Sequence, residues 1–171
     1  MTRLIKAPIN IDFSKIKNDE DFKDEFHSLS QDNNDPIGVW LKNMRSRGKV
    51  VDENEAIFQL LVELHRKVDA LSSKERSYLP LCNNALLDSI GHGLLIFRDN
   101  VLEENSKYYG RISIAIFPQR IMPMYFIAKD SKSANIYLMH SQDIADYDSY
   151  IASRERAMIR EINKLKEINN G

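Results

Sequence analysis

The spacing of hydrophobic residues gives its clearest helical signal over residues 54–72. Apolar residues recur there at spacings of four and three, the a/d pattern of a coiled-coil seam, and charged residues occupy the other faces. The five seam positions are Ile57, Leu61, Leu64, Val68 and Leu71. The pattern predicts a helix with one narrow apolar stripe.

This stripe is compatible with two kinds of packing. A helix that rests on its own domain usually shows a wider stripe, and Leu60 partly supplies the extra position. The alternative is self-association, as a coiled-coil pair or a small bundle. The seam covers only about two heptads, so other contacts, for example around Trp40, would have to add area. We expect a homo-oligomer, a dimer or a tetramer, with this helix at its centre.

Weaker helical signals precede the seam. Residues 18–29 have a weak helical pattern that places Phe22 and Phe26 on one face. A short helix is predicted to begin at Pro36, which suits a first helical position, and to end near Gly48.

From Tyr78 to His140 the pattern changes to short runs rich in β-branched and aromatic residues. In residues 111–117, isoleucines alternate with other residues, as in a half-buried strand. Residues 129–133 are suited to a hairpin turn. The predicted strands are 94–97, 111–117, 122–128 and 134–140. Strands that follow one another without intervening helices favour an antiparallel barrel or sandwich.

Two glycines interrupt the strand pattern in the sequence Asp-Ser-Ile-Gly-His-Gly, residues 88–93. Glycine within a strand indicates a bulge, a tight turn or a close approach of the backbone to another group. One interpretation is a hairpin bend in a barrel. The other is a turn whose backbone amides meet a ligand.

The chain returns to a helical pattern after an acidic turn that contains two tyrosines. The apolar stripe of this last helix consists of Ile151, Met158, Ile162 and Leu165. We expect Tyr147, Tyr150 and Ile151 to pack inward. The three arginines at positions 154, 156 and 160 are expected to form mainly a solvated face.

Composition narrows the class of protein. The formal net charge is −1, from 24 basic and 25 acidic residues, which gives no sign of a nucleic-acid polymer as partner. No apolar run reaches the roughly 18 residues of a membrane span. Cys82, the single cysteine, excludes an intrachain disulfide and fits a reducing compartment, so we expect a cytoplasmic protein.

Residues with catalytic or metal-binding potential are scattered. The four histidines share no metal-ligand spacing with one another or with Cys82. The sequence contains no glycine-rich phosphate loop, nucleophile elbow or HExxH motif. We therefore expect a protein that is not an enzyme and that has no metal and no cofactor.

Together, the segments from Ser77 to Glu161 resemble a PilZ domain. Residues 88–93 occupy the place of the family's Asp/Asn-x-Ser-x-x-Gly motif, with Asp88 and Gly93 at its first and last positions. The end of a PilZ domain often reads as aspartate, then Tyr-Ile and a basic helix. The matching residues here are Asp146, Asp148, Tyr150, Ile151, Arg154, Arg156 and Arg160.

The resemblance implies cyclic di-GMP as a possible ligand, because PilZ domains typically bind this bacterial second messenger. Arginine suits its phosphates and its guanines, since the guanidinium can grip the first and stack on the second. The family uses an Arg-x-x-x-Arg segment just before the barrel, where Arg76 matches the first arginine and Pro80 replaces the second. Ile90 replaces the motif serine. The candidate ligand-binding residues are Arg76, Asp88 and Gly93.

The helix at residues 54–72 is similar to one found in an atypical, oligomerising branch of the family. That helix resembles Leu-x-x-Asn-x-Lys-x-Asp-x-Leu. In this chain Lys67, Asp69 and Leu71 are in place, and His65 stands where asparagine is common.

These patterns predict an α+β protein with an antiparallel PilZ-like β-barrel flanked by N-terminal helices and a C-terminal helix. The expected domains are an N-terminal helical region, 1–73, in which residues 2–12 are extended or unstructured, and a barrel with its C-terminal helix, 74–171. The expected function is a non-catalytic signalling or adaptor module in cyclic di-GMP-linked regulation of motility or surface behaviour. It would act on an unidentified protein partner. The alternative is a direct cyclic di-GMP receptor with a rewired arginine site that uses Arg45, Arg47 or Arg76.

Overall fold

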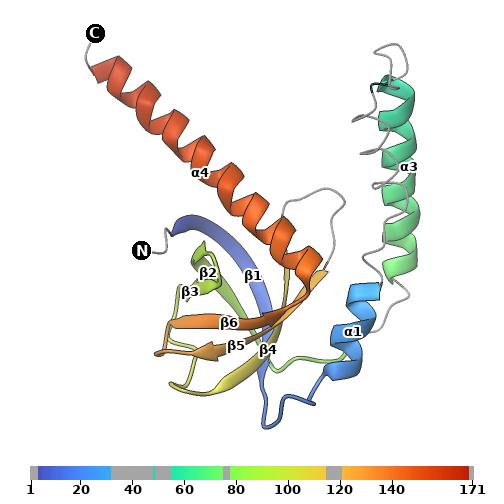
Figure 1. Ribbon diagram of the computed structural model, residues 1–171, viewed down its shortest axis with the longest axis vertical. Helices are drawn as coiled ribbons and strands as arrows, with labels where there is room; N and C mark the ends of the chain where they lie inside the picture. The colour runs from blue at the N-terminus through green and yellow to red at the C-terminus, as the bar shows by residue number, and fades with distance from the viewer. Residues whose placement is uncertain (1–3, 32–47, 49–54, 75–77, 115–120, 170–171) are drawn as a thin grey trace. The chain divides into compact units, whose positions relative to one another are not determined.

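The computed structural model describes residues 4–31, 48, 55–74, 78–114 and 121–169 (Figure 1). The chain divides into two compact units. One consists of residues 1–29 and 80–171, and the other of residues 30–79.

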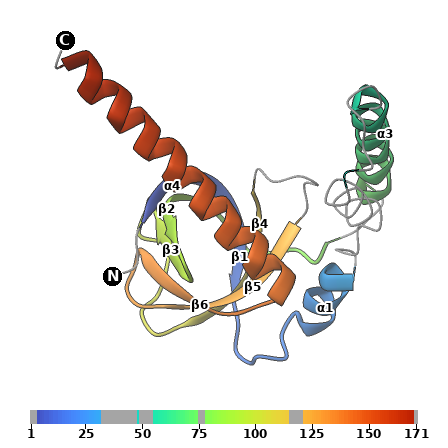
Figure 2. The same ribbon diagram turned by 45° about the horizontal axis from the view of Figure 1, so that its top comes forward.

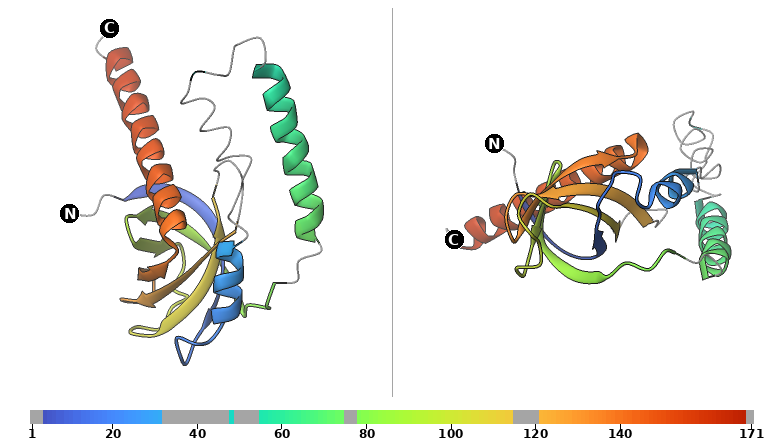
Figure 3. Two further views of the ribbon diagram at one scale, coloured as in Figure 1. Left: turned by 45° about the vertical axis from the view of Figure 1, so that its right-hand side comes forward. Right: turned by 90° about the horizontal axis from the view of Figure 1, so that it is seen from below.

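The first unit is built on a closed antiparallel barrel. Its strands in the described residues are β1 (Ile5–Lys15), β2 (Asn83–Gly91), β3 (Leu94–Phe97), β4 (Lys107–Ser113), β5 (Ile121–Ala128) and β6 (Ser133–Met139). They are ordered β1-β2-β3-β6-β5-β4 around the barrel, and β4 pairs with β1 to close it (Figure 3). The predicted α+β class, an antiparallel barrel with a C-terminal helix, is confirmed.

Strand β1 corrects the predicted domain boundary. The sequence pattern places the barrel after residue 73, but β1 pairs with β2 on one side and with β4 on the other. Its inward residues alternate with polar ones or proline, so the strand has one core face and one outer face. The inward residues include Ile5, Ala7, Ile9, Ile11 and Phe13. Residues 1–29 therefore belong with the barrel unit.

Aromatic side chains fill part of the barrel interior. The ring centroid of Phe13 lies 5.5 Å from that of Phe97 and 5.7 Å from that of Tyr108, both in edge-to-face arrangements. Phe126 stacks on Tyr108 at 5.4 Å. These residues come from β1, β3, β4 and β5, so the aromatic contacts join strands that are distant in sequence.

The hairpin predicted at residues 129–133 is confirmed between β5 and β6. The Asp130 carboxylate accepts hydrogen bonds from the backbone N–H groups of Lys132, at 2.7 Å, and Ser133, at 2.8 Å. This is the local capping that favours aspartate in turns. Strand β4 begins at Lys107, earlier than the predicted run at 111, and Ile112 and Ile114 are buried as the alternation predicts.

The C-terminal helix α4 spans Ser141–Asn169. It includes the acidic segment that the sequence pattern assigns to a turn. Its first part lies on the barrel, where Tyr147 and Ile151 are buried and Tyr150 packs against the core, as predicted. Its later part continues beyond the barrel (Figures 1 and 2).

Two further helices are described. Helix α1 (Lys23–Gln31) begins later than the predicted residue 18, and Phe22 lies just before it with a positive φ of 64°. Helix α3 (Glu55–Lys74) belongs to the second unit and agrees with the helix predicted over residues 54–72. The short helix predicted from Pro36 lies outside the described residues, as do Arg45 and Arg47.

Candidate functional site

The β2–β3 hairpin carries two of the three candidate ligand-binding residues. Asp88 lies in β2, where it is half-buried and accepts a hydrogen bond from the Ser89 hydroxyl at 2.7 Å. Gly93 lies in the turn that follows. Arg76, the third candidate, is outside the described residues.

Gly93 is required by the shape of the turn. Its φ is +69°, in the region where a side chain is disfavoured. A Cβ atom there would have only the Ile136 carbonyl oxygen nearby, at 4.0 Å, so crowding is not the reason for glycine. The predicted hairpin bend at residues 88–93 is therefore confirmed, and the bend alone explains this glycine.

Two positions at which the chain departs from the PilZ motif that it resembles have clear structural consequences. Ile90, which replaces the motif serine, is 0% exposed and belongs to the core of the barrel. A side chain at that place faces the interior and cannot offer a hydroxyl to a ligand. Pro80, which replaces the second motif arginine, is exposed and has neither a charge nor an N–H donor.

A pocket of about 240 Å³ lies beside the hairpin turn. It is formed by the turn, by β6 and by the start of α4. The lining residues are His92, Gly93, Ile136, Tyr137, Leu138, Met139, Ile144, Tyr147 and Asp148. Most of the lining is apolar. Its polar residues include His92 and Asp148, whose Nδ1 and Oδ1 atoms are 2.7 Å apart.

Tyr147 fixes the hairpin to α4. Its buried hydroxyl donates to the carbonyl oxygen of Gly91, at 3.2 Å, and lies 3.5 Å from that of Leu94. Burial raises the pKa of this phenol well above its usual value, with a smaller contribution from the charge of Asp148. The tyrosine predicted to pack inward thus also holds the two ends of the turn in place.

The arginines of α4 lie mainly on an exposed face, as predicted. Arg154, Arg156 and Arg160 are all exposed. Arg154 makes one long contact, 3.5 Å, from its guanidinium to the backbone oxygen of Lys6 in β1.

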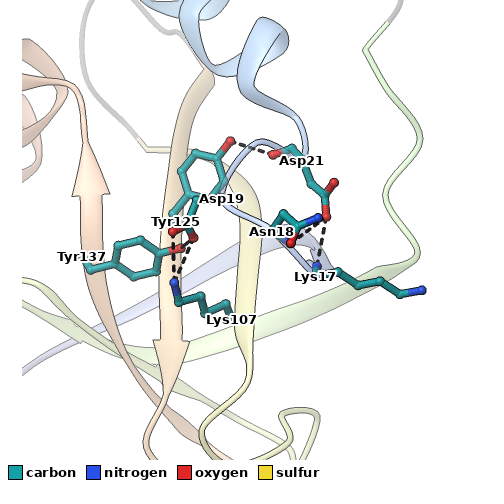
Figure 4. A network of polar contacts seen from close by, with 7 residues as sticks. All are labelled: Lys17, Asn18, Asp19, Asp21, Lys107, Tyr125 and Tyr137. Carbon is teal, nitrogen blue, oxygen red and sulfur yellow. Dashed lines mark hydrogen bonds and ion pairs between the residues drawn. The ribbon is translucent and has the colours of Figure 1, made fainter.

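A polar network, which the sequence pattern does not predict, fixes the segment between β1 and α1 to the barrel (Figure 4). The carboxylate of Asp19 accepts hydrogen bonds from Lys107 Nζ, at 3.0 and 3.1 Å, and from the Tyr137 hydroxyl, at 2.9 Å. The hydrogen bond from Lys107 is the main cause that lowers the pKa of Asp19, and the hydrogen bond from Tyr137 lowers it further. The Tyr125 hydroxyl donates to the backbone oxygen of Asp21 at 2.7 Å. These partners come from β4, β5 and β6, so sequence spacing gave no signal for them.

A second unpredicted cluster holds α1 against the outside of the barrel. Arg111 Nη1 and the Tyr109 hydroxyl both donate to Glu25 Oε1, each at 2.8 Å. All three side chains are largely buried. Phe22 stacks on Tyr109 with ring centroids 4.8 Å apart, a contact that accompanies its positive φ. Arg111 is therefore engaged in holding α1.

The predicted seam of α3 is exposed. The side chains of Ile57, Leu61, Leu64, Val68 and Leu71 are between 52% and 65% exposed, and Leu60 reaches 73%. Isolated exposed leucines are common on soluble proteins, but a continuous stripe along a helix is typical of an interaction face.

The described residues form neither a metal-ligand cluster nor a membrane-spanning helix. No three side chains from His, Cys, Asp and Glu come together as metal ligands in that part of the chain. None of the helices described there has both the length and the apolar character needed to cross a bilayer.

Comparison of the chain with protein-family models, with curated proteins and with solved structures found no match.

Proposed function

We propose that this chain is a non-catalytic, PilZ-like adaptor in cyclic di-GMP-linked regulation of motility or surface behaviour. In this proposal it acts through contacts between proteins, and its nucleotide site is degenerate. The alternative is a direct cyclic di-GMP receptor with a rewired arginine site.

The barrel supports the resemblance on which this proposal rests. The closed antiparallel barrel and the helix that follows it agree with the fold that the PilZ resemblance implies. Asp88 and Gly93 also lie on one hairpin, as residues of a single ligand-contacting turn would.

The degenerate site favours the adaptor over the receptor. Cyclic di-GMP carries two phosphates, and a site that binds it needs cationic or amide donors directed at them. Ile90 contributes to the core, and Pro80 supplies no donor. Loss of a bidentate, desolvated phosphate contact can remove several kcal/mol of binding free energy, out of roughly 8 kcal/mol for a micromolar site.

The observation that carries the adaptor proposal is the exposed seam of α3. Five seam positions, each more than half exposed, form one face of a 20-residue helix. A face of this kind is stabilised by burial against another apolar surface, at roughly 25 cal/mol per Å² of area removed from water. Protein contact is thus the activity that the described surface supports best.

The test is a calorimetric titration of the whole chain with cyclic di-GMP. We expect weak binding or none. Submicromolar binding that Arg76→Ala abolishes would establish the receptor instead. Asp88→Ala serves as a second variant, because a receptor site that uses the hairpin should also lose affinity there.

A further inference from the structure

Helix α4 carries one apolar stripe, which is buried near the start of the helix and exposed toward its end. Tyr147 and Ile151 are buried on the barrel. The same stripe continues after Ile151 with Met158, Ile162 and Leu165, at successive spacings of seven, four and three residues. The later part of α4 continues beyond the barrel (Figure 2). There the stripe is exposed: Ile162 is 44% exposed and Leu165 is 61% exposed.

We propose that the distal part of α4, residues 158–168, pairs in parallel with the same segment of a second copy of this chain. In the heptad that fits the stripe, Met158 and Leu165 occupy d positions and Ile162 occupies the a position between them. A β-branched residue at a with leucine at d favours two-stranded parallel pairs over larger bundles.

The charges beside the seam fit this arrangement. Glu161 lies at g and Lys166 lies at e of the next heptad, and both are exposed. In a parallel pair, a g residue of one helix faces the following e residue of the other, so Glu161 of each copy meets Lys166 of its partner. The two-fold axis produces this ion pair twice. An antiparallel pair would instead bring g positions toward g positions, where the charges are alike.

The attachment of α4 to the barrel reduces the free energy needed to form this pair. A free peptide with so short a seam would first have to nucleate a helix, which is unfavourable. Here the first turns of α4 are already held by Tyr147 and Ile151. Exposed Ile159 and Ile168 flank the seam and add apolar area. The seam is still short, so we expect a weak dimer with a dissociation constant on the order of 100 µM.

This interface does not depend on the α3 seam or on the proposed adaptor function. The two can be separated by testing α4 in a chain that already carries Leu64→Glu, which disrupts the α3 seam. In that background, sedimentation velocity at about 200 µM should show a dimer that dissociates to a monomer at about 5 µM. Adding Ile162→Glu should raise the dissociation constant at least tenfold. Asn163→Glu, its exposed neighbour off the seam, should leave it unchanged.

Charge reversal tests the parallel orientation. Glu161→Lys should weaken the dimer, and adding Lys166→Glu should restore it, because the facing ion pair is re-formed with opposite polarity. Circular dichroism provides the control that every variant remains folded. A folded Leu64→Glu chain that stays monomeric at about 200 µM overturns the proposal, as does a dimer insensitive to Ile162→Glu. If Glu161→Lys leaves the dissociation constant of the Leu64→Glu chain unchanged, the parallel arrangement is overturned. Failure of the adaptor proposal would appear separately, as tight cyclic di-GMP binding or as an α3 seam whose disruption has no effect.

Discussion

Gly93 shows how a residue that resembles part of a ligand-binding motif can be required by folding alone. Its positive φ is costly for any residue with a Cβ, by about 1 kcal/mol for alanine. We predict that Gly93→Ala lowers the free energy of unfolding in urea by about that amount, and that Gly93→Asn lowers it less, because asparagine tolerates this conformation better. Equal stability of the alanine variant and the wild type would show that the turn does not require glycine at this position.

The buried ion pair between Glu25 and Arg111 is a second local feature on which we expect the stability of the fold to depend. Removing one member of a buried ion pair leaves the other charge without compensation, at a cost of roughly 3–5 kcal/mol. We predict that Glu25→Ala destabilises the barrel unit by about 3 kcal/mol in urea denaturation. Asp24→Ala is the matched control: its residue is exposed and adjacent, and we expect almost no change.

The double replacement of Glu25 by Leu and Arg111 by Met separates packing from charge. Apolar side chains of similar size often restore the stability lost when one partner of a buried pair is removed. We expect the double variant to be more stable than Glu25→Ala alone. A double variant that is less stable would show that Arg111 contributes mainly through other contacts.

At the scale of single elements, the α3 seam gives a direct test of self-association. Leu64→Glu places a charge in the seam of every subunit. We predict that the wild-type protein is oligomeric at tens of micromolar and that this variant is a folded monomer at about 10 µM, as measured by light scattering. Circular dichroism is the control for folding. A wild-type protein that is monomeric at this concentration would contradict self-association through the α3 seam. Unfolding of the variant without a monomeric stage would favour packing of α3 on its own domain.

The elements that sequence predicts well are those with a strong local period. The a/d spacing of residues 54–72 predicts α3, and the hairpin signal at 129–133 is capped by Asp130 as local turn chemistry requires. Strand β1 has an equally regular alternation, but Pro8 and the polar outer face resemble an irregular N-terminal segment. Its partners, β2 and β4, are distant in sequence, so its place in the barrel is decided by tertiary pairing.

The candidate site also has features that the sequence predicts and features that it does not. The position of Asp88 and Gly93 on a hairpin follows from the glycine pattern, and the structure confirms the bend. Ile90 as a core residue follows from its apolar side chain on a half-buried strand. The clusters at Glu25 and Asp19 join residues more than 80 positions apart, for which the sequence has no period to detect. The pocket beside His92 likewise depends on where α4 begins, at Ser141 rather than after the acidic segment.

Across the barrel unit, the described helices use buried tyrosines as anchors. Tyr109 and Tyr125 hold the region of α1, and Tyr147 holds α4. Burial is the main cause that raises the pKa of all three phenols, for Tyr125 to about 12. Each phenol is therefore neutral in the folded protein over a pH range in which it would ionise in the unfolded chain.

The sign of the resulting pH dependence follows from these raised values. In the unfolded chain the phenols titrate near 10, so their contribution to stability is fully present below that pH. It is lost as the pH rises through the folded values, because the unfolded state releases protons that the folded state retains. Each such group lowers the free energy of unfolding by about 1.4 kcal/mol per pH unit above the unfolded pKa. We predict a steep loss of stability between about pH 10 and pH 12.

Phenylalanine substitutions test this assignment. Tyr125→Phe and Tyr147→Phe keep the ring but remove the ionisable group and its hydrogen bond. At pH 7 each should cost about 1 kcal/mol, the usual net value of one hydrogen bond. At alkaline pH each variant should lose stability less steeply than the wild type, so the difference between them narrows or reverses. The measurement is urea denaturation at a series of pH values, with the slope of stability against pH as the readout and the offset at pH 7 as the control for packing. Parallel curves for a variant and the wild type would show that its tyrosine does not drive alkaline unfolding.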